Sequence, residues 1–185
     1  ALHQYKVMQL FQTYAKAGGG VLVVLHDIPL AARFADRLLW MKDGCLIATG
    51  AIIYHTTHLH KNVKIRHHAV IREHVEIGES TSIGINATIQ HHVKIGKYCS
   101  LHNFVDIADY STLGEYIFIG PGFMSFADNN LDYRRPHLHE PYKGIIIKDK
   151  ARIGGNVTML PGSVVGEETF VGAGSTVRTV LEDRM

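Results

Sequence analysis

Large aliphatic residues recur at every sixth position over a long central stretch of the chain. The residue four positions after each of them is small or β-branched in nearly every case. Neither an α-helix nor a lone amphipathic strand has a period of six. A strict six-residue period predicts one short strand and one turn per repeat, stacked as a β-solenoid. The twelve aliphatic anchors are Ile53, Leu59, Ile65, Ile71, Ile77, Ile83, Ile89, Ile95, Leu101, Ile107, Leu113 and Ile119.

The six-residue phase breaks after Ile119 and resumes 28 positions later at Ile147. Because 28 is not a multiple of six, we predict an excursion loop over about 125–144 that leaves the solenoid and returns. Loops of this length are usually functional or disordered. Three hexapeptides would close one triangular coil, so the repeats before and after the loop predict about six coils. The resumed anchors are Ile147, Ile153, Met159, Val165, Val171 and Val177.

Glycine often follows the anchor directly, and asparagine or glycine recurs three positions after it, as at Asn62, Asn86 and Gly122. Both residue types tolerate the left-handed backbone conformation that a tight corner needs. Other repeats place residues such as His68 and Phe104 there. The pattern therefore predicts a corner at this position of each repeat.

The first part of the chain does not share this pattern. Its apolar spacing predicts a helix over 3–17, a buried strand of the parallel type over 21–25, and a second helix over 29–35. A β-hairpin with an Asp-Gly turn is expected over 38–48. Because Ile47 keeps the six-residue phase, the last strand of this hairpin is a candidate for the first rung of the solenoid.

The string VLVVLHDIPLAARFADRLLWMKDGCLIATG, residues 21–50, resembles the C-terminal part of the ATP-binding domain of ABC transporters that import iron chelates and haem. By that resemblance His26 matches the switch histidine that contacts the γ-phosphate of ATP. The chain has no G-x-x-x-x-G-K-[ST] loop to hold phosphates, so we expect no ATP binding. The expected organisation is a small α/β segment over 1–50 and a solenoid domain over 51–185.

Composition excludes several other classes of protein. The net charge of the 185 residues is +2, which gives no electrostatic case for nucleic acid or a membrane surface. No apolar run is long enough to span a bilayer, and no signal-peptide pattern is present. Cys45 and Cys99 form no paired-cysteine framework, so we expect a reducing, cytoplasmic environment.

The dipeptide Ile-Gly recurs at many of the anchors. In this the repeats resemble the hexapeptide-repeat acyltransferases over about residues 53–180. The resemblance implies a left-handed parallel β-helix. It also implies acetyl-CoA as co-substrate and a homotrimer with active sites between neighbouring subunits.

Residues 93–135 and 147–177 are similar to sugar-nucleotide N-acetyltransferases, which acetylate an amino group on a UDP-linked amino sugar in polysaccharide pathways. In those enzymes a rung asparagine lies at the reacting amine, and Asn103 is the matching position. Their Asn-Asn pair is Asn103-Phe104 here. The alternative for Asn103 is a structural corner residue. His102 is the nearest alternative base, or a solvated side chain on the outside of a rung.

The excursion loop reads Asp-Asn-Asn-Leu where sugar O-acetyltransferases of this fold carry Asp-Asn-His-Pro, which favours the N-acetyltransferase branch. Polar loop residues are candidates for binding the nucleotide diphosphate of a neighbouring subunit, or are simply solvated. They are Asp128, Asn129, Tyr133, Arg134 and Arg135. The resemblance implies backbone access for the pantetheine arm of CoA in the last coils, although corner geometry alone would explain most of these residues. They are Gly154, Gly155, Gly172, Ala173 and Gly174.

Thirteen histidines raise the alternative of a zinc site, because some carbonic anhydrases share this fold. The G-H-x4-H wording of that family is absent, and side chains of adjacent pairs such as His91-His92 tend to diverge. We therefore expect no metal. Two alternatives to the enzyme stay open: a non-catalytic solenoid or gene-fusion fragment, and a remnant ABC transporter ATPase component.

Overall fold

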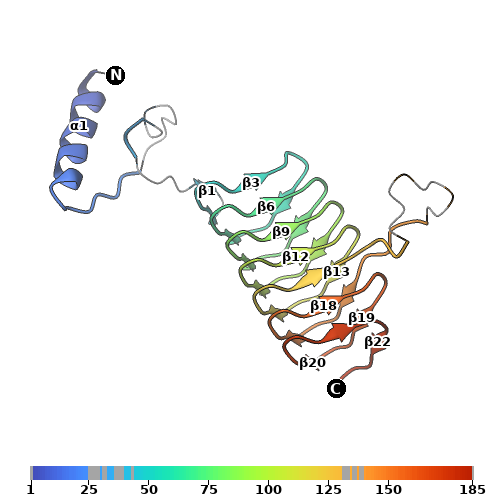
Figure 1. Cartoon of the computed structure of the whole chain (residues 1–185). Coiled ribbons are helices and arrows are strands. Elements are labelled where there is room, and N and C mark those ends of the chain that lie inside the picture. Colours follow the sequence, from blue (N-terminus) through green and yellow to red (C-terminus); the bar gives the residue numbers. More distant parts are fainter. Residues whose placement is uncertain are drawn as a thin grey trace. The chain divides into compact units, whose positions relative to one another are not determined.

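The computed structural model describes residues 2–24, 30, 33–35, 40–42, 44–130, 134, 137 and 140–184. The chain divides into two compact units, residues 1–39 and residues 40–185. Figure 1 traces both units in chain order.

The first unit is built on helix α1 (Leu2–Lys16), close to the predicted range. Gly18 follows it with φ +94°, a conformation that favours glycine at a helix end. Helical residues of the predicted second helix pack back on α1, with the Phe34 ring edge-on to Tyr5 at 5.0 Å and the Arg33 guanidinium 5.2 Å from the same ring.

The predicted buried strand over 21–25 is wrong for the residues that the structure describes. Residues 21–24 form no strand, and the Leu22 and Val24 side chains are 90% and 83% exposed. A strand needs neighbouring strands to pair its backbone groups, and the described part of this unit contains none. His26 lies outside the described residues.

The second unit begins with the predicted hairpin. Strand β1 (Trp40–Lys42) pairs antiparallel with β2 (Cys45–Ile47). Strand β2 pairs in parallel with β5 (Lys64–Ile65), which places Ile47 beside Ile65. The hairpin therefore supplies the first rung of the solenoid.

Three sheets form the faces of the solenoid, and all their strands pair in parallel except β1 and β2. From β2 on the chain visits the sheets in turn, so that every third strand lies in the same sheet (Figure 1). Sheet A contains β1, β2, β5, β8 (Ser82–Ile83), β11 (Ser100–Leu101), β14 (Phe118–Ile119), β17 (Arg152–Ile153) and β20 (Phe170–Val171). Sheet B contains β3 (Ile52–Ile53), β6 (Val70–Ile71), β9 (Thr88–Ile89), β12 (Asp106–Ile107), β15 (Met124–Ser125), β18 (Thr158–Met159) and β21 (Thr176–Val177). Sheet C contains β4 (His58–Leu59), β7 (Glu76–Ile77), β10 (Lys94–Ile95), β13 (Thr112–Leu113), β16 (Ile146–Ile147), β19 (Val164–Val165) and β22 (Val180–Leu181).

The β-solenoid prediction is confirmed, with about seven coils in place of about six. The rungs beyond the twelve and six predicted anchors are β2, whose Ile47 was the candidate first rung, and β15 and β22, which were not predicted. In β15 the inward anchor position is occupied by Ser125 rather than by an aliphatic residue, and it is 5% exposed. Its Oγ accepts a hydrogen bond from the Ala108 N–H at 2.8 Å, which satisfies the buried hydroxyl.

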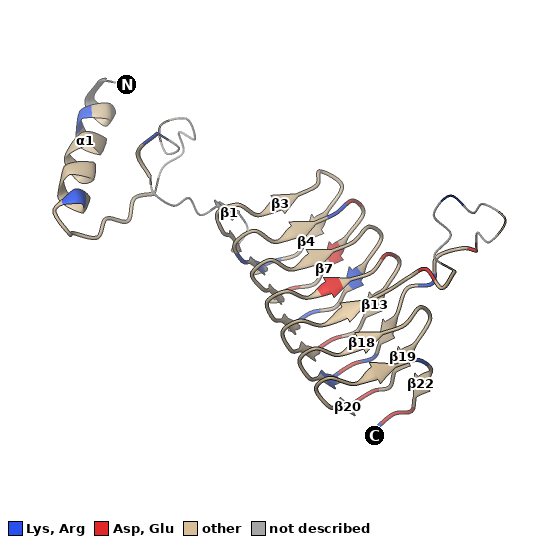
Figure 2. Cartoon of the chain, in the orientation of Figure 1, with Lys and Arg blue, Asp and Glu red and all other residues tan. Residues whose placement is uncertain are grey.

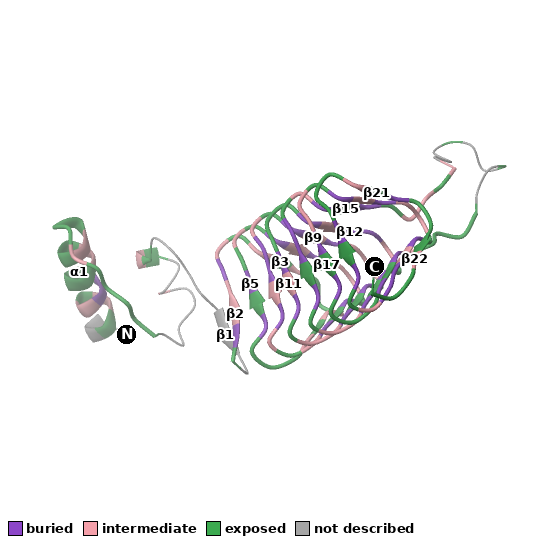
Figure 3. Cartoon of the chain, turned by 90° about the horizontal axis from the view of Figure 1, so that it is seen from below, coloured by how far each residue is buried: buried purple, intermediate pink, exposed green. Residues whose placement is uncertain are grey.

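The anchors fill the interior because a two-residue strand points one side chain inward and the other outward. From β5 to β21 the second residue of each strand is buried, as the alternation along the strands in Figure 3 shows. The residue three positions after the anchor has a positive φ in the corners, for example Asn62 at 59°, His92 at 59° and Phe104 at 58°. The predicted corner position is therefore confirmed.

We name the corners by the sheets they join: the A–B edge, the B–C edge and the C–A edge. The excursion replaces one corner of the B–C edge, between β15 and β16. Its two ends meet through the Lys143 N–H, which donates to the Ala127 carbonyl at 2.9 Å. Gly144 is required at the return, because a Cβ there would lie 2.3 Å from the Tyr110 backbone.

Candidate functional site

A hollow of about 340 Å³ lies on the outer surface where sheet A meets the A–B edge. It is formed over β8 and β11 and the turns that follow them. Gly84 belongs to its lining and brings no side chain into it; a Cβ there would lie 2.3 Å from the His102 carbonyl group. The lining residues are Arg66, Ser82, Gly84, Ile85, Ser100, Leu101, His102 and Asn103.

Asn103 lies exposed at this hollow. Its Oδ1 accepts a hydrogen bond from the Ile85 N–H of the preceding coil at 2.9 Å. Its Nδ2 has no hydrogen-bond partner among the residues that the structure describes. The side chain is thus fixed through its oxygen, which keeps a second lone pair, and presents two free donors.

The same coil-to-coil bond occurs twice on the C–A edge, at the same place in the repeat. Asp149 Oδ1 accepts from the Glu115 N–H at 2.8 Å, and Asp183 Oδ1 accepts from the Glu167 N–H at 2.8 Å. The bond of Asn103 is therefore a recurring structural device of this solenoid. What distinguishes Asn103 is its place at the hollow and its uncharged donor group.

His102 also lines the hollow, and its imidazole is exposed. The ring lies 4.8 Å from the ring of Phe118 on the next coil of sheet A. No ion pair or side-chain hydrogen bond holds either ring nitrogen within the described residues. The imidazole is therefore positioned by ring packing against Phe118.

The five predicted cofactor residues lie on the same edge as Asn103, on later coils. Backbone hydrogen bonds join Gly122 to Asn103, Asn156 to Pro121 and Gly174 to Gly155, so three coil steps separate Asn103 from Gly174. At the strand spacing of a sheet this is about 14 Å.

Packing explains only some of these glycines. A Cβ on Gly154 would lie 2.5 Å from the Ala173 N, so Gly154 is required for coil stacking. A Cβ on Gly172 would have Ser175 Oγ as its nearest neighbour, at 3.8 Å. At Gly174 a Cβ would meet no atom, and only the φ of +73° favours glycine. Stacking of coils therefore requires Gly154, and the left-handed backbone at position 174 favours Gly174.

The structure does not bring the excursion residues to the hollow of the same chain. Asp128 Oδ1 accepts from the Asn130 N–H at 2.7 Å in a local turn, and Asn129 and Arg134 are exposed. The excursion leaves from the B–C edge, whereas Asn103 lies on the A–B edge, with sheet B between them. Tyr133 and Arg135 lie outside the described residues.

The sequence reasoning missed Arg66, Ser82, Gly84 and Ser100 as neighbours of Asn103. Positions 66, 84 and 102 each follow an anchor and are separated by eighteen residues, the length of one coil. Reading the sequence at this period, rather than at six, would have placed them side by side.

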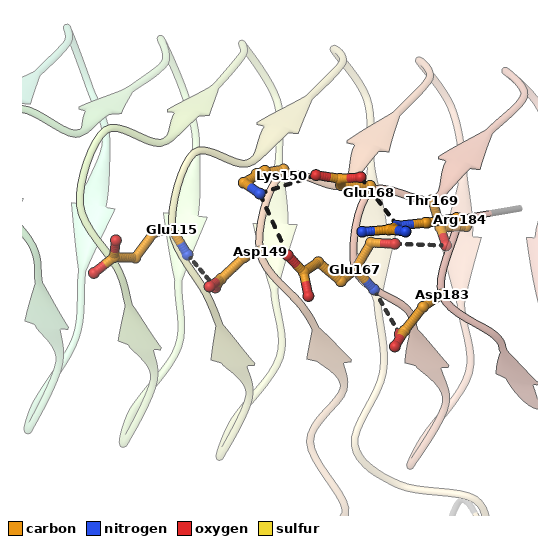
Figure 4. A network of polar contacts seen from close by, with 8 residues as sticks. All are labelled: Glu115, Asp149, Lys150, Glu167, Glu168, Thr169, Asp183 and Arg184. Atoms are coloured by element: carbon orange, nitrogen blue, oxygen red, sulfur yellow. Dashed lines mark hydrogen bonds and ion pairs between the residues drawn. The ribbon is translucent and has the colours of Figure 1, made fainter.

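The C–A edge is occupied by a network of charged side chains (Figure 4). Lys150 Nζ lies 2.9 Å from Glu168 Oε1 and 3.4 Å from Glu167 Oε1, and Arg184 also pairs with Glu168 at 3.3 Å. The hydrogen bond and charge of Lys150 lower the pKa of Glu168, while the two glutamates raise the pKa of Lys150. Figure 2 shows the charged residues along the coils.

Sheet B carries a partly buried carboxylate, that of Asp106. Burial raises its pKa, against a 3.3 Å hydrogen bond from Gln90 Nε2 that lowers it, and the nearby charge of Asp109 raises it further. Asp109 Oδ1 is buried and lies 3.2 Å from His91 Nε2, without hydrogen-bond geometry. Within the described ranges no group of three or more His, Cys, Asp or Glu side chains could hold a metal ion, and no described helix is long and apolar enough to cross a membrane.

A sequence model for the bacterial transferase hexapeptide, six repeats, matches residues 74–108. Solved structures with a similar solenoid include a putative acetyltransferase of Bacillus cereus, with TM-score 0.43 and 21% identity, covering 72% of this chain and 69% of that one. They also include the UDP-N-acetylglucosamine acyltransferase of Francisella novicida, with TM-score 0.47 and 19% identity, covering 76% and 59%.

The first part of the chain is similar to a different class of protein. It is 48% identical over 50 residues to the hemin import ATP-binding protein HmuV of Rhizobium johnstonii. The match covers 27% of this chain, which spans only 19% of that relative. Both resemblances seen in the sequence are thereby confirmed. The chain joins a short segment similar to part of a hemin import ATP-binding protein to a solenoid that carries the bacterial transferase hexapeptide repeat.

Proposed function

We propose that the solenoid is an acyltransferase that moves the acetyl group of acetyl-CoA to the amino group of a nucleotide-linked amino sugar. The observation that carries the proposal is the Asn103 side chain, whose free amide donors stand at a hollow lined by hydroxyl and cationic groups. The match of residues 74–108 to the transferase hexapeptide repeat supports the reaction class. The resemblance to sugar-nucleotide N-acetyltransferases supports the acceptor, and with it a place in polysaccharide biosynthesis.

The chemistry requires a neutral amine, a positioned thioester and donors for the developing oxyanion. The amine nitrogen forms a bond to the acetyl carbon, the carbon–sulfur bond breaks, and CoA leaves as thiolate. In this proposal the second lone pair of Asn103 Oδ1 accepts from the amine and Nδ2 donates to the thioester oxygen. His102 accepts the proton that the amine nitrogen loses and passes it to the thiolate.

The cofactor is proposed to lie along the A–B edge. The pantetheine arm would run along the backbone of Gly154, Gly155, Gly172, Ala173 and Gly174, over the roughly 14 Å from Asn103 to the rung of β20. No metal takes part in this proposal.

A homotrimer would complete the site. Within one chain the excursion and the hollow lie on different edges, so a neighbouring copy is needed to bring Asp128, Asn129, Tyr133, Arg134 and Arg135 to the substrate. A cytoplasmic location, where acetyl-CoA and nucleotide sugars are at hand, belongs to the same proposal, and so does the absence of nucleic acid and membrane partners.

The test incubates the purified chain with acetyl-CoA and each of a panel of UDP-linked amino sugars. A thiol reagent detects the free CoA that acetyl transfer releases. Cys45 and Cys99 are 4% and 2% exposed, so the folded protein should contribute little background. Transfer to at least one amino sugar is expected. Failure to acetylate any member of the panel would refute the proposal.

A non-catalytic solenoid is the second candidate, favoured by the recurrence of the Asn103 hydrogen bond at two places on the C–A edge. Calorimetry with CoA separates the two, because a non-catalytic solenoid should bind none. We propose that residues 1–50 are a segment of separate origin from the solenoid over 51–185, although the hairpin of β1 and β2 at the end of this segment packs as the first rung of the solenoid. A remnant ATPase would require that segment to bind a nucleotide, which equilibrium dialysis with ATP can measure.

A further inference from the structure

Two adjacent histidines lie in a corner of the B–C edge, two coils before the excursion. His91 and His92 follow β9, and their Nδ1 atoms are 2.9 Å apart. Side chains of adjacent residues tend to diverge on a strand, but His92 has a left-handed backbone with φ 59°. The expected divergence of this pair is therefore wrong, because the corner turns the two rings toward each other.

The contact between the rings depends on how many protons they carry. A hydrogen bond between the two Nδ1 atoms needs a proton on one atom and a lone pair on the other. Two neutral rings can satisfy this condition, and so can one neutral ring beside one imidazolium. Two imidazolium rings cannot, because both Nδ1 atoms then carry a proton and the two positive charges repel each other.

Carboxylates on both neighbouring coils favour a positive charge on His91. Its Nε2 lies 3.2 Å from Oδ1 of Asp109, a buried oxygen without a hydrogen bond in the described part of the chain. On the preceding coil Glu73 lies within range of the same charge, and it is paired with Arg72 at 3.0 Å. One additional proton can therefore be held on His91 while the contact with His92 stays intact.

Aromatic rings, rather than carboxylates, flank His92. Its ring lies 4.7 Å from that of His74 on the preceding coil and 5.0 Å from that of Tyr110 on the next coil. A proton on His92 would thus face the charge on His91 and a further imidazole that can itself become charged. The second proton therefore opposes the contact.

Tyr110 connects the histidine pair to the coil above it. Its ring stacks on His92 with 24° between the ring planes and meets His91 edge-on at 5.2 Å. Its N–H donates to the His91 carbonyl at 3.2 Å. Separation of the two imidazoles would therefore remove the surface on which Tyr110 packs.

The return of the excursion rests on the turn that contains Tyr110. Gly144 lies against the Tyr110 backbone. Ser111 Oγ accepts a hydrogen bond from the Ile145 N–H at 3.1 Å and donates to the Ala108 carbonyl at 2.7 Å. A contiguous set of contacts thus leads from the histidine pair to the residues at which the excursion rejoins the solenoid.

We propose that the His91–His92 pair is a proton-sensitive support of the excursion. The support is closed while the two rings carry at most one positive charge, and it opens when both are protonated. The open form binds one more proton than the closed form, so its population rises as pH falls. Histidine is the side chain that ordinarily titrates between pH 5 and 8. The root of the excursion is therefore ordered at neutral pH and loosened in mild acid, whatever reaction the solenoid performs.

Hydrogen exchange of the full chain at pH 7.5 and pH 5.5, corrected for the intrinsic pH dependence of amide exchange, tests this proposal. Because opening takes up one proton, protection of the amides over 140–147 should fall by up to about tenfold per pH unit. Amides over 114–119 turn the C–A corner and should keep their protection. A uniform loss over both ranges would indicate general acid destabilisation and would overturn the proposal.

Two variants remove the second charge in different ways. His92→Phe keeps a ring for the stack and cannot be protonated, and Phe104 shows that this place in the repeat accepts phenylalanine. His91→Gln keeps an amide donor for His92 and also cannot be protonated. In each variant the amides over 140–147 should be equally protected at both pH values. The matched control is His68→Phe, the same substitution at the same place in the repeat on the A–B edge, which should keep the pH dependence.

Three results would contradict the inference. The first is equal protection of 140–147 at both pH values in the unmodified chain. The second is an undiminished loss in acid in both His92→Phe and His91→Gln, and the third is loss of the pH dependence in His68→Phe. Circular dichroism of each variant shows whether the solenoid is folded, so that a folding defect in one histidine variant leaves the other to decide.

Discussion

At the C–A edge and the A–B edge of the solenoid, the corners of successive coils pack on one another in different ways. The C–A edge fills its corners with charged and aromatic side chains that bind one another, from the stacked rings of Tyr98 and Tyr116 at 5.0 Å to the ion pairs of Lys150. The A–B edge has no ion pair among its described residues, and glycines let its coils touch backbone to backbone.

The difference suggests that side chains of the C–A edge stabilise the fold, whereas those of the A–B edge can bind a ligand. On the C–A edge most polar groups already have partners within the chain, so a ligand would have to displace them. On the A–B edge the Asn103 NH2 group, the His102 imidazole and the Arg66 guanidinium are without such partners among the described residues. An edge that leaves polar groups open to solvent is the one suited to bind a substrate.

The largest effect should come from removing the polar group that the A–B edge presents. Asn103→Ala is expected to reduce kcat/KM for acetyl transfer about a hundredfold or more, as for loss of an oxyanion donor. The matched control is Asp149→Ala, which loses the same coil-to-coil hydrogen bond on the C–A edge. Equal loss of transfer in both variants would show that Asn103 acts only through stability.

The next effect tests the close contact of coils at the A–B edge. Gly84→Ala would place a Cβ 2.3 Å from the His102 carbonyl group, so we expect destabilisation of about 1–3 kcal/mol in urea unfolding. Gly172→Ala holds the same place after its anchor but meets only Ser175 Oγ at 3.8 Å. It should unfold close to the unmodified chain, and equal destabilisation of the two variants would contradict the packing argument.

A smaller effect is expected on the C–A edge. Lys150→Gln should lower Tm at low salt, and less at high salt, because its partners are exposed. Lys150 lowers the pKa of Glu168 from the ordinary 4.5, so its contribution is present above pH 4.5 and is lost as pH falls through the folded pKa. Thermal unfolding across pH 3–7 measures this, with Lys64→Gln as the control that should change little.

The smallest effect concerns the partly buried carboxylate of sheet B. Because burial raises the pKa of Asp106, its charged form weakens the fold as pH rises from the ordinary 3.8 through the folded pKa. Asp106→Asn should therefore raise Tm at pH 7, and the gain should vanish below pH 3.8. Asp183→Asn, whose folded pKa is lowered chiefly by Lys148, should show the opposite sign.

The solenoid could be predicted because its information is local and repeated. The burial of each anchor can be predicted from its place in the six-residue repeat. Ile47 keeps the same spacing, so the first rung could be predicted without knowledge of distant residues. Ser125 was missed as a rung because a hydroxyl breaks the hydrophobic pattern, and only the Ala108 N–H above it makes that burial tolerable. Leu181 was missed because its spacing from Val177 is four.

The candidate site could be predicted only in part. Asn103 could be predicted because the sequence around it resembles that of known enzymes. Arg66 and Ser82 lie near it only because the coils stack, and the six-residue period does not show which residues stack. The strand expected over 21–25 failed for the opposite reason, since its local signal is strong but the described part of its unit lacks strands to pair with.

The excursion has a consequence for how this fold can change. The coils on either side of it pair as if it were absent, with Thr112 beside Ile146 and Asp106 beside Met124. A change in its length would therefore alter no strand register, and loop lengthening carries only a slowly growing entropic cost. The excursion can therefore change in length and sequence while the pairing of the solenoid strands on either side of it stays the same.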